Sequence, residues 1–361
     1  MERVLANKAN WLVSHGFQIV VVTTEQRGRK PFFDLDERIV CYDLNINYEE
    51  NNRKSFFNKL VHYPFKQWKH RQRLTDLLDR LKADVVISMF CNDASFLPSI
   101  NDGSKKLLEI HFSRYKRLQY SRKGLWRWAD IWRSHYDEKI ARRYHRFVVL
   151  TKEDREYWGN LKNICVIPNA RTFEMESPTS LDDKKVIAIG RYTYQKGLDR
   201  LIDAWSIVCK QRQDWMLYLI GEGELRETLQ EQISQLGLQD NVVLGKVETR
   251  VQPIYQQASI MVLSSHYEGL PMVLLEAQAA GLPIVSFDCK CGPKDVITDG
   301  VDGFLIKEGD VEAMANRILQ LMDDDVLRKN MGLAAFTHSE RYAESTIMQH
   351  WVSLFSQLEK V

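Results

Sequence analysis

Short apolar runs alternate with amphipathic stretches along nearly all of the 361 residues. Such alternation predicts parallel β-sheets covered by helices, because each parallel strand needs a crossover before the next one. The pattern predicts one series of strands in the first half of the chain and a second series in the other half. The predicted strands are residues 17–24, 39–44, 84–90, 106–111 and 147–151, then 185–190, 215–220, 241–245, 259–263, 283–287 and 303–306.

The segment 167–183 separates the two series and contains Pro168, Asn169 and Pro178 in a polar stretch. A chain of 361 residues also exceeds the usual size of one hydrophobic core. We therefore predict an α/β protein with two doubly wound domains, residues 1–174 and 175–361. A helical pattern over residues 340–359 predicts a long terminal helix.

The segment SHYEGLPMVLLEAQAAGLPIVS, residues 265–286, contains two carboxylates, Glu268 and Glu276, with seven residues between them. A buried strand precedes this segment. Gly269 is a turn residue, and Pro271 suits the first position of the helix that follows. Glu268 is therefore expected in the turn, and Glu276 about a turn and a half into the helix.

This spacing brings both carboxylates near the start of one helix. A single ligand can then contact Glu268, Glu276 and the N–H groups of Met272 and Val273. Carboxylates accept hydrogen bonds from sugar hydroxyls, and a helix N-terminus binds phosphate. The layout therefore fits a glycosyl diphosphate.

A second segment indicates the same kind of ligand. The apolar run 186–190 ends at Gly190 and leads into the loop GRYTYQKG, which contains Arg191 and Lys196. A planar guanidinium and a compact ammonium group can together neutralise a departing diphosphate without a metal ion. The alternative is that both are ordinary surface charges.

Two further positions lie at predicted strand ends. Gly221, in the turn Gly221-Glu222-Gly223, permits close backbone approach, although any tight turn after a strand uses glycines. His111 ends the strand 106–111, at the sheet edge where folds of this kind bind ligands, but a lone histidine is also often structural. Glu109, on the same strand face, is a weaker candidate.

In their order and spacing, these segments and the run GPKDVITDG at 292–300 resemble the retaining glycosyltransferases of family 4. The resemblance implies the GT-B fold, in which two Rossmann-like domains face a central cleft. It implies that residues 175–361 bind a nucleotide diphosphate sugar and residues 1–174 bind the acceptor. The terminal helix 340–359 is then expected to pack back on the first domain.

The resemblance also implies roles for individual residues. Arg191 and Lys196 would stabilise the leaving diphosphate, Glu276 would accept ribose hydroxyls, and Glu268 would face the donor sugar. The expected catalytic residues are Arg191, Lys196, Glu268 and His111, and the expected donor-binding residues are Gly190, Arg191, Lys196, Gly221, Lys246, Val247, Glu268, Gly269, Met272, Val273 and Glu276. Lys246 and Val247 follow the strand 241–245, where the family places the base against the backbone.

The expected function is retaining transfer of a hexosyl or N-acetylhexosaminyl group from a UDP-sugar to a glycan or lipid-linked glycan. Capsule, O-antigen or exopolysaccharide synthesis is the expected pathway. We predict no cofactor and no metal, because Asp323-Asp324-Asp325 fits a turn with a helix cap. The alternatives are a nucleotide-sugar epimerase of the same fold and a non-catalytic nucleotide-sugar-binding protein.

Members of this family begin with a strand and a glycine-rich loop before their first helix. This sequence starts at Met1 with a pattern that already belongs to that helix. We therefore expect the first strand and its loop to be missing.

The net charge of +2 hides an asymmetry, because residues 51–150 contain 22 Lys or Arg and 9 Asp or Glu. Within this region, residues 105–146 also contain eight aromatic residues, including Trp126, Trp128 and Trp132. Such a stretch suits an anionic membrane surface. The alternative is a solvated helix face, and we expect most of these tryptophans to lie in the core. No recognition motif for nucleic acid is present.

No apolar run approaches the ~18 residues of a membrane span, and no signal peptide is evident. A cytoplasmic protein, peripheral on the inner face of the membrane, is therefore expected. The six cysteines are scattered, so we expect reduced thiols.

Overall fold

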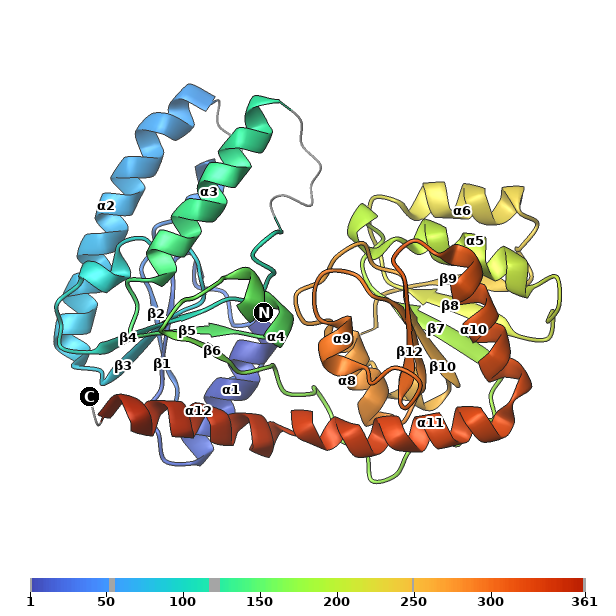
Figure 1. Cartoon of the computed structure of the whole chain (residues 1–361). Coiled ribbons are helices and arrows are strands. Elements are labelled where there is room, and N and C mark those ends of the chain that lie inside the picture. The colour runs from blue at the N-terminus through green and yellow to red at the C-terminus, as the bar shows by residue number, and fades with distance from the viewer. Residues whose placement is uncertain (1, 52–55, 117–123, 249, 360–361) are drawn as a thin grey trace.

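The computed structural model describes residues 2–51, 56–116, 124–248 and 250–359, and Figure 1 shows two α/β domains side by side. The elements of the first domain are α1 (Glu2–Ser14), β1 (Val20–Thr23), β2 (Val40–Asp43), η1 (Tyr48–Asn51), α2 (Phe56–Leu81), β3 (Val85–Ser88), η2 (Leu97–Ser99), β4 (Lys105–Glu109), α3 (Leu125–Ala141), β5 (Arg146–Val149), α4 (Lys152–Tyr157) and β6 (Ile164–Val166).

The strands of the first domain form two parallel sheets. One has the order β3-β4-β5-β6, and the other pairs β1 with β2. Leu107 and Leu108 of β4 and Phe147 and Val148 of β5 are fully buried. Such continuous apolar strands occur where helices cover both faces of a sheet. In Figure 1, α2 and α3 project from the same side of this sheet.

The second domain contains a larger parallel sheet. Its elements are β7 (Lys185–Ile189), η4 (Tyr194–Lys196), α5 (Leu198–Val208), β8 (Met216–Ile220), α6 (Arg226–Gln235), β9 (Val242–Gly245), α7 (Gln252–Gln256), β10 (Ile260–Leu263), α8 (Met272–Ala279), β11 (Ile284–Phe287), α9 (Pro293–Val296), β12 (Gly303–Ile306), α10 (Val311–Asp323), α11 (Asp325–His338), η5 (Ser339–Tyr342) and α12 (Glu344–Glu359). The strand order is β12-β11-β10-β7-β8-β9, so the direction of winding reverses between β7 and β10. This is the doubly wound arrangement that the sequence predicted.

Each strand predicted from the sequence is present, but β6 was not predicted. Its three residues are only half-buried, and so short a segment shows no clear apolar pattern. It nevertheless pairs with β5, with Phe147 opposite Ile164. The predicted boundary between residues 174 and 175 falls in the connection between β6 and β7.

The terminal helix begins later than predicted. Residues 339–342 form the short helix η5, and α12 starts only at Glu344. Ala343 between them has an extended backbone, with ψ of 144°, which interrupts the helical pattern.

The prediction that most tryptophans of the basic stretch lie in the core is wrong. Trp126, Trp128 and Trp132 are 64%, 73% and 66% exposed on α3. Instead, α3 buries Asp130 and Ser134. Large hydrophobic residues usually face inward, so an exposed group of them on one helix indicates an interaction surface.

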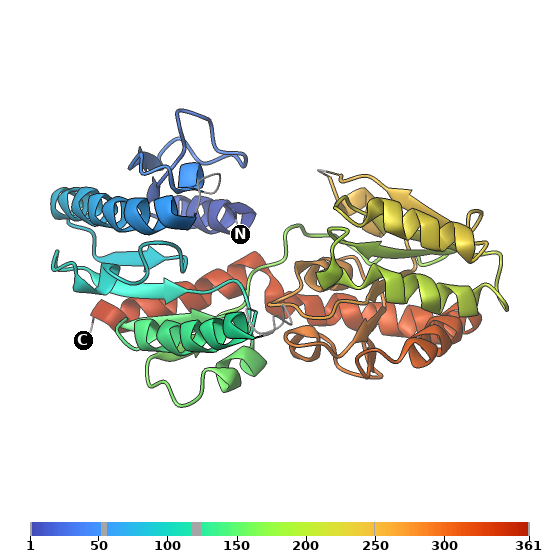
Figure 2. The same ribbon diagram turned by 90° about the horizontal axis from the view of Figure 1, so that it is seen from above.

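The helix α12 joins the two domains. It leaves the second domain through α11 and η5 and runs along the first domain, as Figures 1 and 2 show. Trp351 is 1% exposed and packs in a core that contains Leu12 of α1, Val148 of β5 and Leu275 of α8. The Nζ atom of Lys8 lies 3.7 Å from the centre of the Trp351 ring. The two domains therefore share one continuous apolar core.

Among the described residues, no helix is both long enough and apolar enough to cross a bilayer. The six cysteines are free.

Replacing Trp351 with Ala should destabilise the protein by roughly 3 to 5 kcal/mol, because it leaves a large cavity between α12 and the first domain. Thermal unfolding would measure the loss. Ser353→Ala is the matched control, because Ser353 is exposed on the same helix. Equal melting temperatures for the two variants would contradict the interdomain role of α12.

Candidate functional site

Two loops meet where the winding of the second sheet reverses. The loop 190–197 follows β7 and the loop 264–271 follows β10, and these two strands are neighbours. Ser264 Oγ donates to the carbonyl of Lys196 at 2.9 Å, and Gln195 Nε2 donates to the carbonyl of Tyr267 at 3.1 Å. Gly197 has φ +55°, and a Cβ there would lie 2.4 Å from the Ser264 carbonyl oxygen. Only glycine therefore allows the two loops to approach so closely.

An ion pair connects these loops. Lys196 Nζ lies 2.7 Å from Glu268 Oε1, and Ser265 Oγ donates to the same oxygen at 2.6 Å. Glu268 is 7% exposed. The Lys196 side chain passes over Gly190 on its way to Glu268. The structure therefore brings together two predicted catalytic residues that are 72 positions apart.

Arg191 lies beside this pair on the same loop and is exposed. Among the described residues, its guanidinium has no hydrogen-bond or ion-pair partner, so it remains available to an anion. The turn at Gly221 closes against the loop, because a Cβ on Gly221 would lie 1.9 Å from the carbonyl oxygen of Gly190. Gly221 is thus needed to bring the ends of β7 and β8 together.

The buried Tyr192 connects the next strand to the same edge. Its hydroxyl lies 2.7 Å from the carbonyl oxygen of Leu219 and 2.9 Å from that of Gly245, and donates its proton to one of them at a time. Lys246 and Val247 follow Gly245 and are exposed. The predicted base-contacting backbone therefore lies at the same sheet edge as the cation loop.

Glu276 lies within α8 and is 6% exposed, so the side chain is not on the helix surface. Thr172 Oγ1 donates to its Oε1 at 2.7 Å, and the Tyr255 hydroxyl donates to its Oε2 at 2.7 Å. Burial raises the pKa of Glu276, and these hydrogen bonds oppose that effect. The carboxylate is thus held in place by one residue of the interdomain connection and one residue of α7.

The start of α8 differs from the prediction by one residue. The helix begins at Met272, and Pro271 is the residue before it, with an extended backbone. Met272 and Val273 are half-buried in its first turn, and the Met272 sulfur lies 3.5 Å from Asn169 Nδ2.

Thr172 and Tyr255 were not identified from the sequence. Thr172 lies in the connection between the domains, six residues after the end of β6 at Val166, so no strand pattern marks it. Nothing in the sequence pattern distinguishes Tyr255 from other buried tyrosines.

In the first domain, His111 and Glu109 lie next to each other. His111 Nε2 is 3.2 Å from Glu109 Oε1, and Lys8 Nζ donates to both oxygens of Glu109 at 2.6 and 2.5 Å. Burial alone would raise the pKa of Glu109, but Lys8 and His111 lower it to about 2. Glu109 is therefore engaged in a buried ion pair with Lys8, and its role in the cleft stays a prediction.

His111 lies at the contact between the domains. A Cβ on Gly269 would be 3.2 Å from the His111 carbonyl oxygen, so the turn after β10 packs against the end of β4. Below this contact, the Asp295 carboxylate accepts the backbone N–H groups of Lys152 and Glu153, at 2.8 and 3.3 Å. Asp295 of the second domain therefore caps α4 of the first domain, a role that the sequence did not indicate.

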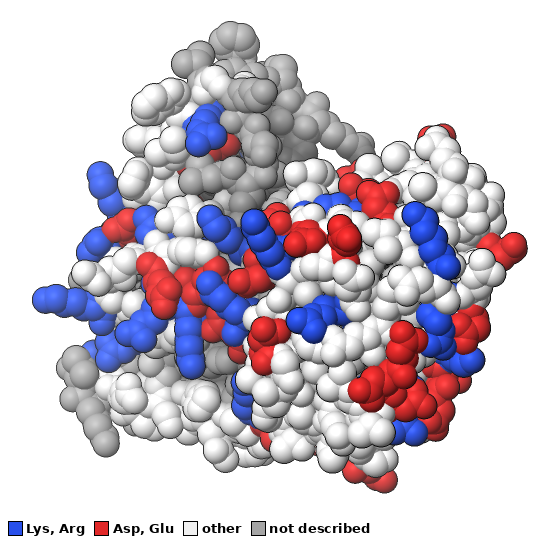
Figure 3. Space-filling view, turned by 45° about the vertical axis from the view of Figure 1, so that its right-hand side comes forward, with Lys and Arg blue, Asp and Glu red and all other residues white. Residues whose placement is uncertain are grey.

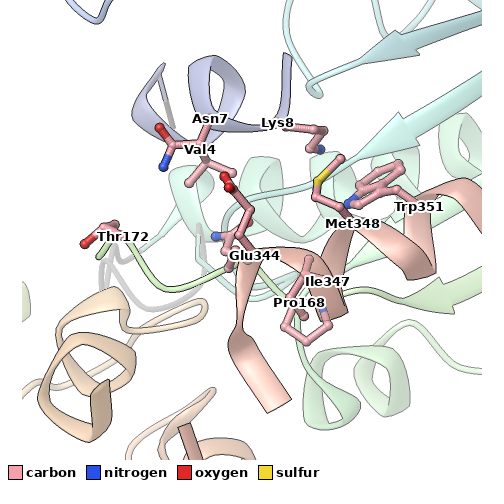
Figure 4. Close-up of a pocket in the computed structure, with 11 residues that line it drawn as sticks. Val4, Asn7, Lys8, Pro168, Thr172, Glu344, Ile347, Met348 and Trp351 are labelled. Atoms are coloured by element: carbon pink, nitrogen blue, oxygen red, sulfur yellow. The ribbon is translucent and has the colours of Figure 1, made fainter. Parts of the chain in front are cut away.

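A small pocket lies between α1, α12 and the connection between the domains (Figure 4). Val4, Asn7 and Lys8 line it on one side and Glu344 and Met348 on another. Thr172, which holds Glu276, also contributes to its wall. Thr172 thus links the wall of this pocket to the buried carboxylate of Glu276.

Two doubly wound domains, with a cation-bearing loop and buried carboxylates close to their contact, define a protein with the GT-B fold. Residues 1–171 match the family model "Glycosyltransferase Family 4", and residues 170–338 match "Glycosyl transferases group 1". The chain therefore belongs to this family of glycosyltransferases.

Similar proteins come from bacterial glycan synthesis. The amylovoran biosynthesis glycosyltransferase AmsD of Erwinia amylovora is 35% identical over 216 residues, 57% of this chain and 60% of that protein. An uncharacterized glycosyltransferase of Haemophilus influenzae is 28% identical over 356 residues, 97% of this chain and 94% of that protein.

A TarM variant from S. aureus, solved in complex with Fondaparinux, alpha-GlcNAc-glycerol and UDP, is similar in structure. Its TM-score is 0.66 and its identity 26%, over 78% of this chain and 58% of that chain. The matched regions thus span about three fifths of AmsD and of TarM.

Arg191→Ala should weaken UDP binding by about 1.5–3 kcal/mol, the value of a charge-assisted hydrogen bond, without affecting the fold. Isothermal titration calorimetry would measure the change. Lys210→Ala, an exposed cation of the same domain, is the control. Unchanged UDP affinity in the Arg191 variant would show that this loop does not bind the diphosphate.

Proposed function

We propose that the chain is a retaining glycosyltransferase that transfers a hexosyl or N-acetylhexosaminyl group from a UDP-sugar to a glycan or lipid-linked glycan. Capsule, O-antigen or exopolysaccharide synthesis is the proposed pathway, and AmsD and TarM support it by the activities and ligands in their names. The observation that carries the proposal is the Lys196–Glu268 pair beside the available Arg191.

The cation loop fits a leaving diphosphate. An ammonium group has three protons, so Lys196 can keep its bond to Glu268 and still donate to a phosphate oxygen. Because Glu268 balances the charge of Lys196, Arg191 supplies the positive charge in excess. Glu268 holds Lys196 in place before the ligand arrives, which is how preorganised groups stabilise a developing charge, and Arg191 extends from the same loop.

The two carboxylates fit the two sugar units of the donor. Glu268 has one oxygen that accepts from Lys196 and Ser265, and its other oxygen can accept a hydroxyl of the transferred sugar. Glu276 is fixed by Thr172 and Tyr255 and retains lone pairs for the ribose hydroxyls.

The acceptor would bind on the first domain, on the side of His111. In the proposed step, the bond between the anomeric carbon and the diphosphate oxygen breaks, and the bond to the acceptor oxygen forms on the same face. The proton of the acceptor hydroxyl passes to the departing diphosphate oxygen. The chain then contributes positioning and electrostatic stabilisation and no covalent nucleophile.

The test is a transfer assay with UDP-sugars in the presence and absence of glycan acceptors. Formation of UDP together with a glycosylated acceptor supports the proposal. Conversion of the donor without an acceptor would indicate an epimerase instead. UDP binding without turnover of any donor would indicate a binding protein.

Glu276→Gln should weaken the binding of free UDP, because it removes an anionic acceptor for the ribose. Glu268→Gln should lower kcat more than UDP affinity, because this side chain is assigned to the sugar. Steady-state kinetics and calorimetry on both variants separate the two roles. Equal losses of free-UDP affinity in the two variants would contradict the assignment.

Activity should survive chelation, because Arg191 and Lys196 supply positive charge at the leaving group. In the carboxylate run 323–325, Asp324 has a structural role, since it caps α11 by accepting the N–H group of Leu327 at 2.8 Å. Assays with excess EDTA would measure the effect. Loss of transfer with EDTA, and its recovery with Mn²⁺, would show that a metal neutralises the diphosphate.

A further inference from the structure

The first turns of the helix α3 expose aromatic side chains and bury polar ones. Trp128, Trp132 and Tyr136 follow one another at helical spacing on its outward side, and the rings of Trp132 and Tyr136 stack at 5.6 Å. The inward side carries Asp130 and Ser134, which are 4% and 6% exposed, and becomes apolar at its end, where Ile140 and Ala141 are buried. A helix that served only the core would show the opposite distribution.

The neighbouring helix α2 adds a second aromatic group. Tyr63, Phe65 and Trp68 are 46%, 60% and 54% exposed, and the rings of Phe65 and Trp68 stack at 5.8 Å. Burial raises the pKa of Tyr63, and the charge of Arg133 on α3 lowers it, so the two helices lie close enough to interact. Figure 1 shows both helices projecting from the same side of the first domain.

Exposed cations accompany these rings. Arg71 on α2 and Arg127, Arg133 and Lys139 on α3 are all exposed. In Figure 3, most of the blue side chains lie on the half of the molecule that belongs to the first domain.

Two basic residues at the start of the stretch 105–146 form ion pairs inside the protein and do not add to the exposed charge. Lys106 is buried against Asp102. Arg114 is bonded to Glu138 and to the carbonyl of Tyr157. The charged surface is therefore narrower than the sequence indicated, and it extends to α2.

We propose that residues 63–71 of α2 and 126–139 of α3 form a membrane-docking surface for a bilayer that contains anionic lipids. This proposal rests on the proposed function, because a lipid-linked acceptor would then be presented beside the cleft. Tryptophan and tyrosine rings favour the headgroup region, where one end of the ring is apolar and the other is polar. Arginine and lysine add attraction to anionic headgroups.

The combination of features favours a bilayer over the other possible partners. A soluble acidic polymer would be attracted by the cations but would not require exposed tryptophans at helical spacing. A second copy of the chain would bring the same cations together and repel. A bilayer with anionic lipids matches both the rings and the charges.

The first experiment is flotation of the full chain with phosphatidylcholine vesicles, with and without phosphatidylglycerol. We expect binding to the mixed vesicles at low salt and much weaker binding at 0.5 M salt or to phosphatidylcholine alone, since salt screens exposed charges. Brominated lipids in the bound vesicles should quench tryptophan fluorescence. Absence of binding to mixed vesicles at low salt would overturn the proposal.

Paired variants then locate the surface. Arg127→Gln with Arg133→Gln should reduce the partition coefficient about 30-fold, since each cation near an anionic surface contributes ~1 kcal/mol. Trp128→Ala with Trp132→Ala should reduce it about tenfold or more and should lower quenching by brominated lipids. The controls are Lys210→Gln with Lys307→Gln, and Phe32→Ala, because these side chains are exposed outside the surface.

Each variant is also titrated with UDP, and its affinity should match that of the wild type. This separates the docking surface from the donor site, so that either proposal can fail alone. Equal vesicle binding by the wild type and both paired variants would place the membrane contact elsewhere. A dimer of the wild-type chain that the tryptophan variant abolishes would identify a second copy as the partner and overturn the proposal.

Discussion

The candidate site depends on one topological constraint, the adjacency of β7 and β10 at the point where the second sheet reverses its winding. Connections that leave neighbouring strands in opposite directions open a crevice at the carboxyl edge of the sheet. Two loops distant in sequence can then meet there, and the close contact at Gly197 brings Lys196 against Glu268. The pair would be costly to bury separately, because each charge needs the other. Together they leave the net charge of the site to Arg191, whose exposed position allows it to respond to a ligand.

A second constraint connects the domains. The helix α12 follows the second domain in sequence and packs Trp351 against Lys8 of the first, and Asp295 of the second domain caps α4 of the first. These contacts determine where His111 lies relative to Gly269, because the segment that leads to Asp295 packs on the loop of Gly269. A site divided between two domains requires such contacts, because an independent movement of either domain would separate the groups. Lys8 connects α12 to the end of β4, since it neutralises Glu109 and lies over the Trp351 ring.

The sequence was sufficient for the parts of the fold that repeat a local pattern. Apolar runs identified every strand except β6, whose three residues contain too little pattern. The loops with Arg191 and Glu268 could be placed because both follow strong strand signals. The partners of Glu276 could not be predicted, because Thr172 and Tyr255 are 104 and 21 residues away and only the packing of the domains brings them together.

The tryptophans of α3 were misjudged for a different reason. Composition alone does not tell which side of a helix faces the core, and here the buried side carries Asp130 and Ser134 before it ends in Ile140 and Ala141.

The two domains therefore differ in how completely internal interactions explain them. In the second domain, the groups described at the sheet edge either hold a loop or lie at a strand end, and their arrangement follows from the doubly wound sheet. In the first domain, the buried ion pair of Lys8 and Glu109 and the apolar strands β4 and β5 are explained in the same way. The outer faces of α2 and α3 are not, because folding gains nothing from a tryptophan that remains mostly in water. Burying Asp130 and Ser134 on the opposite side adds a desolvation cost that their hydrogen bonds only offset. The proposed contact with a bilayer would account for this arrangement, which folding alone does not favour.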